Sequence, residues 1–450
     1  MTKPKLKVVD GAGAPPGEDR WQSLLTRTKD GNVEGTLHNL CLILERDANF
    51  DGLFWLNESS NQVVLSRSPP WTSGNVHEFT DQDGCELAAW LQDPAHYAMR
   101  CGADLALAGV ITVARRHRRH PIREYLQSRE WDGTPRIERM FVDLFGAADN
   151  RYSHQAARCF MVGAVARMLW FDPKVPSVGA KVDFMLVLEG AQGKKKTTSV
   201  STLFGAQWYA ETLESPSGKD FYQALLGCWC VEIAEMDSFT KADTTAVKVA
   251  ITRRSDKYRA PYERVPKTFR RECIFVGTTN ETEWLRDATG GRRFLPLKIL
   301  DDGEIKIAGI EAQRDQLWAE AVQLFAQGVE WWKLPEDAVE EQELRFFEDS
   351  WADRIARWLE GRAPGDNAYP GRILRSEPIR WTTTDELLQY AIGMDAGRHG
   401  RQEQMRISNI MKRAGWLHKR STWDGSKERS RRWMRVSDDP RGDGGDDAPF

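Results

Sequence analysis

The sequence of 450 residues has no large excess of charge of either sign, because 63 Lys and Arg residues oppose 66 Asp and Glu residues and leave a formal net charge of −3. This balance excludes a uniformly basic protein that coats nucleic acid, so any nucleic-acid site must depend on local groups of cations. Cysteine is sparse, and its seven copies follow no regular spacing. A disulfide-rich fold is therefore excluded, and the odd number favours free thiols in a reducing compartment.

Long apolar segments are missing as well. The first 20 residues lack the apolar stretch of a secretory signal. The longest apolar run, Leu105–Ala114, is too short for a membrane-spanning helix, which needs about 20 residues. We therefore expect a cytoplasmic protein with no membrane partner. Its content of 41% hydrophobic and 29% charged residues is typical of folded globular domains, and its length predicts about three of them.

The pattern of apolar residues changes along the chain. Three short apolar runs, Phe184–Gly190, Cys228–Glu235 and Glu272–Thr279, predict buried strands separated by helices. Such alternation is typical of an α/β fold with a mostly parallel sheet. Other segments predict helices over residues 33–47, 83–98, 136–146, 153–171, 311–327 and 339–359, and a pair of strands over residues 52–56 and 62–65.

These patterns divide the chain into seven parts. Gly and Pro in residues 362–372 indicate a linker, and Asp and Gly in the last residues indicate disorder. The predicted parts are a flexible leader (1–20), an N-terminal α+β region rich in helices (21–120), a helical collar-like region (121–182), an α/β core (183–330), a helical extension with a linker (331–372), a winged-helix-like DNA-binding module (373–436) and a disordered tail (437–450).

The first core strand leads into the sequence GAQGKKKT at residues 190–197 and then into a helix-compatible segment. A strand, a Gly-rich turn and a helix in this order suit a phosphate-binding loop, because the first amides of the helix face the anion. Lys196 lies where an ammonium would reach the β- and γ-phosphates of ATP, and Thr197 where a hydroxyl would ligate Mg²⁺. An ordinary basic turn is the alternative. The candidate ATP-binding residues are Gly190, Gln192, Gly193, Lys194, Lys195, Lys196, Thr197 and Thr198.

Lys195 departs from that pattern, since the residue before the loop lysine is normally Gly. Gly supplies backbone freedom and lets the phosphate approach closely, so a Cβ at this position is expected to strain the loop. Residue 195 therefore leaves two alternatives open, an active ATPase site and an impaired one.

Acidic side chains follow the second core strand. Glu232 and Glu235 come near its end, downstream of the loop. Carboxylates in this place suit coordination of Mg²⁺ through water and activation of an attacking water. Thr197 and Glu232 are thus the candidate metal ligands, and Glu235 is a second catalytic candidate. The structural alternative is a helix cap, because acidic residues are common in the first turn of a helix.

Polar and cationic side chains follow the third core strand. Asn280 comes at its end, where an amide can orient the lytic water, although Asn also forms turns. Arg292 and Arg293 follow a pair of glycines, and a guanidinium that reaches a neighbouring subunit would stabilise transition-state charge. Surface ion pairs are the alternative for both arginines. The catalytic candidates are Lys196, Glu232, Glu235, Asn280, Arg292 and Arg293.

Two segments concentrate positive charge. Residues 252–271 carry eight Lys and Arg against two acidic residues, and residues 398–435 carry twelve against three. Aromatic residues interleave with these cations, as in sites for single-stranded nucleic acid, and the second segment predicts helices followed by a hairpin centred on Asp424 and Gly425, as in a winged helix. Solvated basic surface is the alternative. The DNA-binding candidates are Arg253, Arg254, Lys257, Tyr258, Arg259, Lys267, Arg270, Arg406, Lys412, Arg413, Arg431 and Arg432.

Together these motifs resemble the virulence-associated protein E family of prophages and mobile elements. The resemblance begins near residue 120 and continues to about residue 325, through HPIREYLQSREWDGTPRI, EGAQGKKKTT, VEIAEMDSF, RRSDKYRAPY, FVGTTNETEWLRDATGGRRFLPL and DQLWAEAVQLF. It implies a P-loop NTPase core of the AAA+ or superfamily-three helicase type within residues 183–330, with ATP and Mg²⁺ as cofactors. It also places residues 252–271 where such a core carries a DNA-tracking hairpin.

The resemblance further implies roles and partners. It assigns the Walker A roles to Lys196 and Thr197, the Walker B role to Glu232, the sensor role to Asn280, and the arginine finger to Arg292 or Arg293. Members are expected to be DNA-dependent ATPases and helicases of mobile-element replication that bind single-stranded DNA or an origin duplex and assemble as homo-oligomers, with a hexameric ring as the expected form. Two other hypotheses remain: a replication-initiation factor that binds DNA and nucleotide at an impaired ATPase site, and an assembly protein that uses nucleotide only to hold an oligomer.

Overall fold

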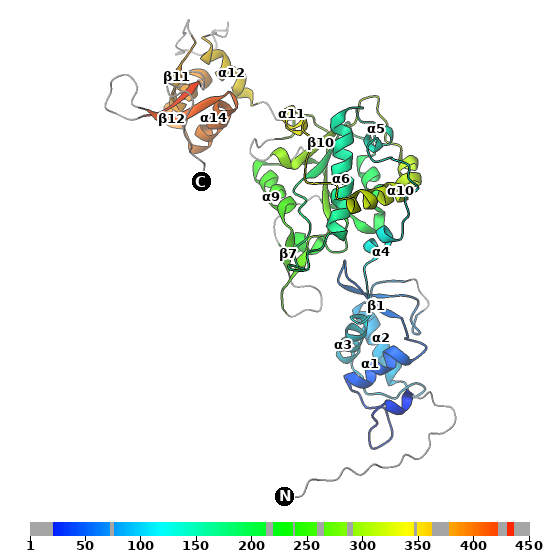
Figure 1. The fold of residues 1–450 in the computed structure, drawn as a ribbon. Helices are drawn as coiled ribbons and strands as arrows, with labels where there is room; N and C mark the ends of the chain where they lie inside the picture. The colour runs from blue at the N-terminus through cyan, green and yellow to red at the C-terminus, as the bar shows by residue number, and fades with distance from the viewer. Residues whose placement is uncertain are drawn as a thin grey trace. The chain divides into compact units, whose positions relative to one another are not determined.

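The computed structural model describes residues 21–72, 76–212, 219–236, 239–258, 265–285, 291–345, 349–361, 378–421 and 430–435. The chain divides into two compact units, Met1–Thr282 with Arg292–Gln342, and Glu283–Gly291 with Glu343–Phe450 (Figure 1). The predicted leader, linker residues 362–372, hairpin tip and tail lie outside the described residues. Within the described ranges, no helix is both long and apolar enough to cross a membrane.

The N-terminal part of the first unit is built on a three-stranded sheet of order β2-β1-β3. β1 and β2 pair antiparallel, which confirms the predicted pair of strands, and β3 pairs parallel with β1. Aromatic rings fill its core, where the ring centroids of Phe50 and Trp90 lie 4.9 Å apart. Its elements are η1 (Gln22–Leu24), α1 (Leu37–Arg46), β1 (Phe54–Asn57), β2 (Gln62–Leu65), α2 (Asp81–Gln92), α3 (Ala103–Ala114) and β3 (Arg118–Arg119).

The α/β core of the first unit is a parallel five-stranded sheet of order β10-β4-β9-β6-β5. This topology confirms the predicted α/β fold with a parallel sheet. The three inner strands are those that the apolar runs predict, and every residue in them is buried. The strands are β4 (Met185–Glu189), β5 (Tyr209–Thr212), β6 (Cys230–Ile233), β9 (Ile274–Thr279) and β10 (Phe294–Lys298).

Helices pack against this sheet and complete its apolar core. Trp229, which directly precedes β6, and Trp318 from α10 are fully buried, with ring centroids 4.2 Å apart. The indole Nε1 of Trp318 donates to the carbonyl of Leu203 at 2.8 Å, which ties α10 to α7. The remaining elements of the core are α4 (Pro121–Gln127), α5 (Met140–Asp143), α6 (Arg151–Leu169), α7 (Lys196–Phe204), η2 (Ala206–Trp208), α8 (Lys219–Ala224), α9 (Lys241–Thr252), η4 (Gly291–Arg293), α10 (Ile307–Ala326) and α11 (Ala338–Glu343).

Residues 252–271 contain an antiparallel hairpin, in which β7 (Ser255–Tyr258) pairs with β8 (Lys267–Arg270). The tip at residues 259–264 lies outside the described residues. A buried ion pair joins the two arms, because Nη2 of Arg271 lies 2.6 Å from Oδ1 of Asp256 and the side chains are only 1% and 7% exposed. One of the eight cations of this segment is therefore part of the hairpin's own structure.

The second unit is built on a three-stranded sheet of order β11-β13-β12, and β12 pairs antiparallel with β13. Trp416 and Trp433 belong to its core. Nε1 of Trp433 donates to Oγ1 of Thr384 at 3.0 Å, which satisfies the buried indole. Its elements are α12 (Ser350–Leu359), β11 (Trp381–Thr382), α13 (Thr384–Glu386), the π-helix η5 (Leu387–Ile392), η6 (Ala396–Arg398), α14 (Arg401–Arg413), β12 (Trp416–Ser421) and β13 (Ser430–Arg435).

Two predicted helices are wrong in extent. The helix over residues 83–98 ends at Gln92, before an Asp93–Pro94 step, because the residue before a proline disfavours helical geometry. The helix over residues 339–359 is two helices, α11 and α12, and the division between the units falls at the end of α11, after Gln342. Asp349 starts α12 afresh, since its side chain accepts a hydrogen bond from the amide of Trp351.

The helix predicted over residues 136–146 is also wrong, because only the short α5 forms. The amides of Arg136 and Ile137 donate to one carboxylate oxygen of Glu320 on α10, at 2.7 and 3.0 Å. The guanidinium of Arg136 pairs in turn with Asp132. These contacts hold the segment before α5 in a non-helical conformation. Burial raises the pKa of the Glu320 carboxyl.

Candidate nucleotide-binding site

The loop between β4 and α7 makes a tight turn at the carboxyl end of the sheet. Gly193 has a φ of 85°, a value that favours glycine, and a Cβ added there would meet no atom within 4 Å. Lys195 has φ 60° and ψ 30°, so this residue adopts the left-handed conformation that glycine would adopt without strain. The helix α7 then begins at Lys196, with its first amides facing the turn.

The side chain of Lys196 is buried and folded back over the loop. Its Nζ donates to the carbonyls of Gly190 and Ala191, at 2.6 and 3.2 Å, and to Oδ1 of Asn280 at 2.9 Å. Asn280 follows β9, the neighbour of β4, so the sheet itself places the amide beside the ammonium. The structure therefore brings together a lysine and an asparagine that are far apart in the sequence.

Glu232 on β6 is completely buried and is held by three hydroxyl groups. Thr197 and Thr278 both donate to its Oε1, at 2.7 and 2.8 Å. Tyr209 on β5 donates to its Oε2 at 2.7 Å. Burial, reinforced by this contact with a carboxylate, raises the pKa of Tyr209 far above its usual value, so the phenol stays a donor. The carboxylate thus has a fixed orientation, directed at the start of α7.

A cavity of about 400 Å³ lies between the loop and the ends of the strands. Of the four non-glycine residues with positive φ in the described part of the chain, Lys195 and Glu235 line this cavity. Strained residues of this kind concentrate at functional sites. The lining consists of Gln192, Gly193, Lys194, Lys195, Lys196, Thr197, Glu211, Ala234, Glu235, Thr278, Thr279 and Asn280.

Two predicted ATP-binding residues do not line the cavity, and a third, Lys194, lines it but is engaged elsewhere. Gly190 supplies a carbonyl to Lys196 and has a φ of 157°, and Thr198 is exposed on α7; neither lines the cavity. Lys194 lies at its edge, but its Nζ donates to the carbonyls of Asp301 and Gly303, each at 2.7 Å. Lys194 therefore anchors the loop to the segment after β10.

Arg292 and Arg293 are not brought to this cavity. They directly precede β10, whose first residue, Phe294, pairs with Met185 at the start of β4. The loop instead follows Glu189 at the end of β4, about 13 Å further along the strand. Within the described residues, the buried Nε of Arg293 has no hydrogen-bond partner.

Several predicted DNA contacts in the first unit have partners inside the protein. The guanidinium of Arg253 lies 4.4 Å from the ring centroid of Tyr222, Nε of Arg254 donates to the carbonyl of Gly179 at 2.8 Å, and Nε of Arg270 lies 3.0 Å from Glu272. Lys257 and Lys267 are exposed on the two arms of the hairpin, the backbone of Tyr258 pairs with that of Lys267, and Arg259 and the side chain of Tyr258 lie outside the described residues.

The cationic candidates of the second unit also comprise residues with partners inside the protein and residues that are exposed. Arg406 pairs with Asp349 at 2.7 Å and stacks 3.9 Å from the centroid of Trp351. Arg432 lies 4.0 Å from the centroid of the Trp381 ring. Lys412 and Arg413 in the last turn of α14, and Arg431 on β13, are exposed.

Sequence reasoning missed Tyr209 and Thr278 as partners of Glu232. Tyr209 lies on a short edge strand, β5, that carries no apolar run, so neither the strand nor its place beside β6 is visible in the sequence. Thr278 is the residue before Thr279, the last residue of β9, and it faces the same side of the sheet as Glu232 because Glu232 pairs with Val276, a register that the sequence alone does not give.

Residues 126–348 match the family model described as the virulence-associated protein E-like domain. The chain thus carries such a domain over that segment, which spans the sheet, the loop and the cavity. No curated protein matches the chain.

Among solved structures, the chain is similar to the apo structure of the NrS-1 C terminal region (305-718), with 13% identity, a TM-score of 0.40, and coverage of 68% of this chain and 75% of that one. The A form apo structures of the same region give TM-scores of 0.42 and 0.44 at 11% identity, covering 85% of this chain and 96% of theirs.

Proposed function

We propose that this protein is a DNA-dependent ATPase of a prophage or mobile element, with a P-loop NTPase core of the AAA+ or superfamily-three helicase type. The observation that carries the proposal is the meeting of Lys196, Thr197, Glu232 and Asn280 at the carboxyl end of one parallel sheet. Ligands of α/β sheets bind at this end of the strands. An ammonium, a hydroxyl, a buried carboxylate and an amide are the groups that phosphoryl transfer to water requires.

The residues present fit ATP with Mg²⁺. The turn at Gly193 leaves open space where a phosphate would approach, and the amides at the start of α7 face that space. Thr197 and Glu232 would hold Mg²⁺, directly and through water, and the ion would neutralise charge on the phosphate oxygens. Hydrogen-bond acceptors already hold the Lys196 ammonium at the floor of the site, within reach of a β- or γ-phosphate.

Each remaining side chain has a definite task in hydrolysis. Asn280 orients the attacking water, while Glu235, exposed at the cavity edge, is the candidate base that accepts its proton. Glu232 accepts hydrogen bonds from three hydroxyl groups and keeps Thr197 in place. Arg292 and Arg293, which lie at the opposite end of their own sheet, would reach the nucleotide of a neighbouring copy, so the proposed enzyme works as a homo-oligomer, with a hexameric ring as the expected form.

DNA is the proposed partner, because exposed cations extend along a hairpin beside the core and along α14 and β13 of a winged-helix-like second unit. The test is phosphate release from ATP by the full chain in the presence of Mg²⁺, with and without single-stranded DNA, combined with the particle mass. We expect stimulation by DNA and a mass of several copies. Hydrolysis that DNA leaves unchanged would contradict the proposal.

The left-handed Lys195 favours a second candidate, a DNA-binding replication-initiation factor that binds nucleotide at an impaired site. A Cβ in this conformation costs roughly 1–2 kcal/mol, and the loop must carry that strain. Tight binding of ATP without turnover, in the presence and absence of DNA, would favour this candidate over the DNA-dependent ATPase.

A further inference from the structure

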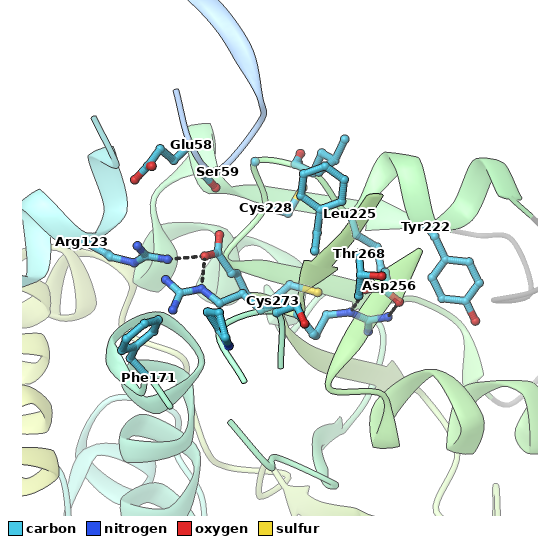
Figure 2. A pocket seen from close by; sticks show the side chains of 18 of the residues that line it. Glu58, Ser59, Arg123, Phe171, Tyr222, Leu225, Cys228, Asp256, Thr268 and Cys273 are labelled. Atoms are coloured by element: carbon cyan, nitrogen blue, oxygen red, sulfur yellow. Dashed lines mark hydrogen bonds and ion pairs between the residues drawn. The ribbon is translucent and has the colours of Figure 1, made fainter. Parts of the chain in front are cut away.

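A second cavity, of about 520 Å³, lies where the N-terminal region meets the base of the β7–β8 hairpin (Figure 2). The turn after β1 forms one wall with Glu58 and Ser59, and its position is fixed because the amide of Gly227 donates to the carbonyl of Ser59 at 3.1 Å. Arg123 and Phe171 belong to other walls; in the view of Figure 2, Arg123 lies between Ser59 and Phe171. The N-terminal region therefore contributes directly to this cavity.

Positive charge prevails on its walls, since four arginines face three carboxylates. Glu272 is shared by two guanidiniums, that of Arg123 and that of Arg270, whose Nε lies 3.0 Å away. One carboxylate cannot neutralise two cations. The side chain of Arg118 is 57% exposed, and its Nη1 lies 3.8 Å from the nearest carboxylate oxygen of Glu58, a long distance for an ion pair. An anionic group that enters the cavity would therefore be attracted by guanidinium groups that the carboxylates do not fully neutralise.

A hydroxyl group without a partner adds a second sign of a ligand. Ser59 is 7% exposed, and its Oγ has no hydrogen-bond partner within the described residues. Buried polar atoms almost always have a partner, so an exception at the wall of a cavity calls for one. A phosphate oxygen, which accepts hydrogen bonds from hydroxyl and guanidinium groups alike, suits this position between Ser59 and Arg123.

The mouth of the cavity presents an aromatic ring to solvent. Phe171 is 57% exposed, an unusual state for a large apolar side chain beside a charged cavity. Grooves for single-stranded nucleic acid combine such rings, on which bases stack, with cations that follow the phosphates. A cavity of this composition next to the exposed lysines of the hairpin is suited to a single strand that passes along both.

We propose that this cavity binds one nucleotide unit of single-stranded DNA that runs along the hairpin, with its phosphate between Arg118, Arg123 and Ser59 and its base against Phe171. This inference rests on the proposed DNA-dependent function, and it gives the N-terminal region a role in holding the strand. The strand would then cross from the N-terminal region to the hairpin of the same subunit.

The test measures binding of labelled oligothymidylate of about 15 nucleotides to the full chain over a range of salt concentrations. The variants are Phe171→Ala and Arg118→Gln, both at exposed positions, with Val175→Ala as control, because Val175 is 45% exposed nearby but does not line the cavity. We expect Phe171→Ala to weaken binding at least about fivefold, Arg118→Gln to reduce the slope of log K against log salt by about 0.7, and Val175→Ala to bind like the wild type.

The inference is overturned if both cavity variants bind the oligomer as tightly as the wild type does. It is also overturned if thymidine monophosphate competes as strongly as the unlabelled oligomer, because the cavity would then be a mononucleotide pocket. ATP hydrolysis by the wild type is measured separately. If the protein binds the single strand in a way that depends on Phe171 but does not hydrolyse ATP, the proposed ATPase activity is wrong and the inference about this cavity is supported. If the protein hydrolyses ATP and both cavity variants bind the single strand like the wild type, the ATPase activity is supported and the inference about this cavity is overturned.

Discussion

The hydroxyl of Thr197 lies 2.7 Å from Oε1 of Glu232 and donates a hydrogen bond to it. This contact joins the first turn of α7 to β6, two elements that the sequence separates by η2, β5 and α8. It also sets side by side the two oxygen atoms proposed to face Mg²⁺. The buried carboxylate would be costly without such donors, so the hydroxyl cluster around Glu232 is a condition for the site's geometry.

We expect Tyr209→Phe to lower ATP hydrolysis about tenfold and to raise the Mg²⁺ concentration at half-maximal rate. The substitution removes the donor at 2.7 Å from Oε2 of Glu232 and leaves a buried carboxylate oxygen unpaired, a loss of about 1–3 kcal/mol. Tyr125→Phe is the matched control, because it removes a phenol that donates to Asp315 at 2.6 Å, away from the cavity. Equal Mg²⁺ dependence of the two variants would contradict a positioning role for Tyr209.

We expect Lys195→Gly to increase ATP hydrolysis severalfold. Glycine adopts φ 60° and ψ 30° without the cost of a Cβ, so the loop would close around phosphate with less strain. The control is Ala98→Gly, which relieves a φ of 45° in the N-terminal region and should leave turnover unchanged. Turnover that stays the same or falls in Lys195→Gly would show that the left-handed lysine does not impair the loop.

Because Arg293 lies at the far end of its own sheet, we expect Lys196→Ala and Arg293→Ala each to abolish hydrolysis, and a mixture of the two inactive variants to recover part of it. In a mixed oligomer, some interfaces pair an intact loop with an intact arginine. The rate of phosphate release is followed after equal amounts are mixed and allowed to exchange subunits. The parallel mixture with Arg292→Ala identifies which arginine acts. No recovery in either mixture would contradict a contribution in trans.

Thiol chemistry gives an independent check of the fold. Cys85 is exposed, whereas burial raises the pKa of Cys101 and Cys159 to about 11 and that of Cys228 to about 12. Because the thiolate is the reactive form, we expect a thiol reagent at pH 8 to modify Cys85 rapidly and the other three slowly, with faster reaction as pH rises toward these values. Mass spectrometry of the labelled protein measures this order. Rapid labelling of Cys159 at pH 8 would contradict the packed core around α6.

Much of the core could be predicted from the sequence, because its inner strands are continuous apolar runs and the loop lies between a strand and a helix. The two edge strands of the sheet could not be predicted from the sequence. β5 reads Tyr-Ala-Glu-Thr, with no apolar run, and β10 contains Pro296, which is unusual in a strand and tolerated here at the edge of the sheet. Their order in the sheet, which sets where Tyr209 and Arg293 lie, depends on long-range pairing that local patterns do not contain.

The charge patterns predicted where cations gather but not which of them are exposed. Arg271 belongs to a buried ion pair with Asp256, and Arg270 shares Glu272 with Arg123. These partners come from tertiary packing, so a count of basic residues in a segment overstates the charge that the surface presents. The N-terminal region, for which the sequence suggested no role, lines one cavity together with the hairpin base, and local patterns do not contain that arrangement either.

The most direct test of the proposed ATPase compares Lys196→Ala with Lys174→Ala, a change at an exposed lysine outside the cavity. The measurement is phosphate release from ATP in Mg²⁺ and saturating single-stranded DNA, at equal protein concentration and after both variants are shown to be folded. We expect Lys196→Ala to lose about 100-fold or more of the DNA-stimulated rate, because the cation that would face the phosphates is gone, and Lys174→Ala to match the wild type. Equal rates for the two variants would contradict the assignment of the site.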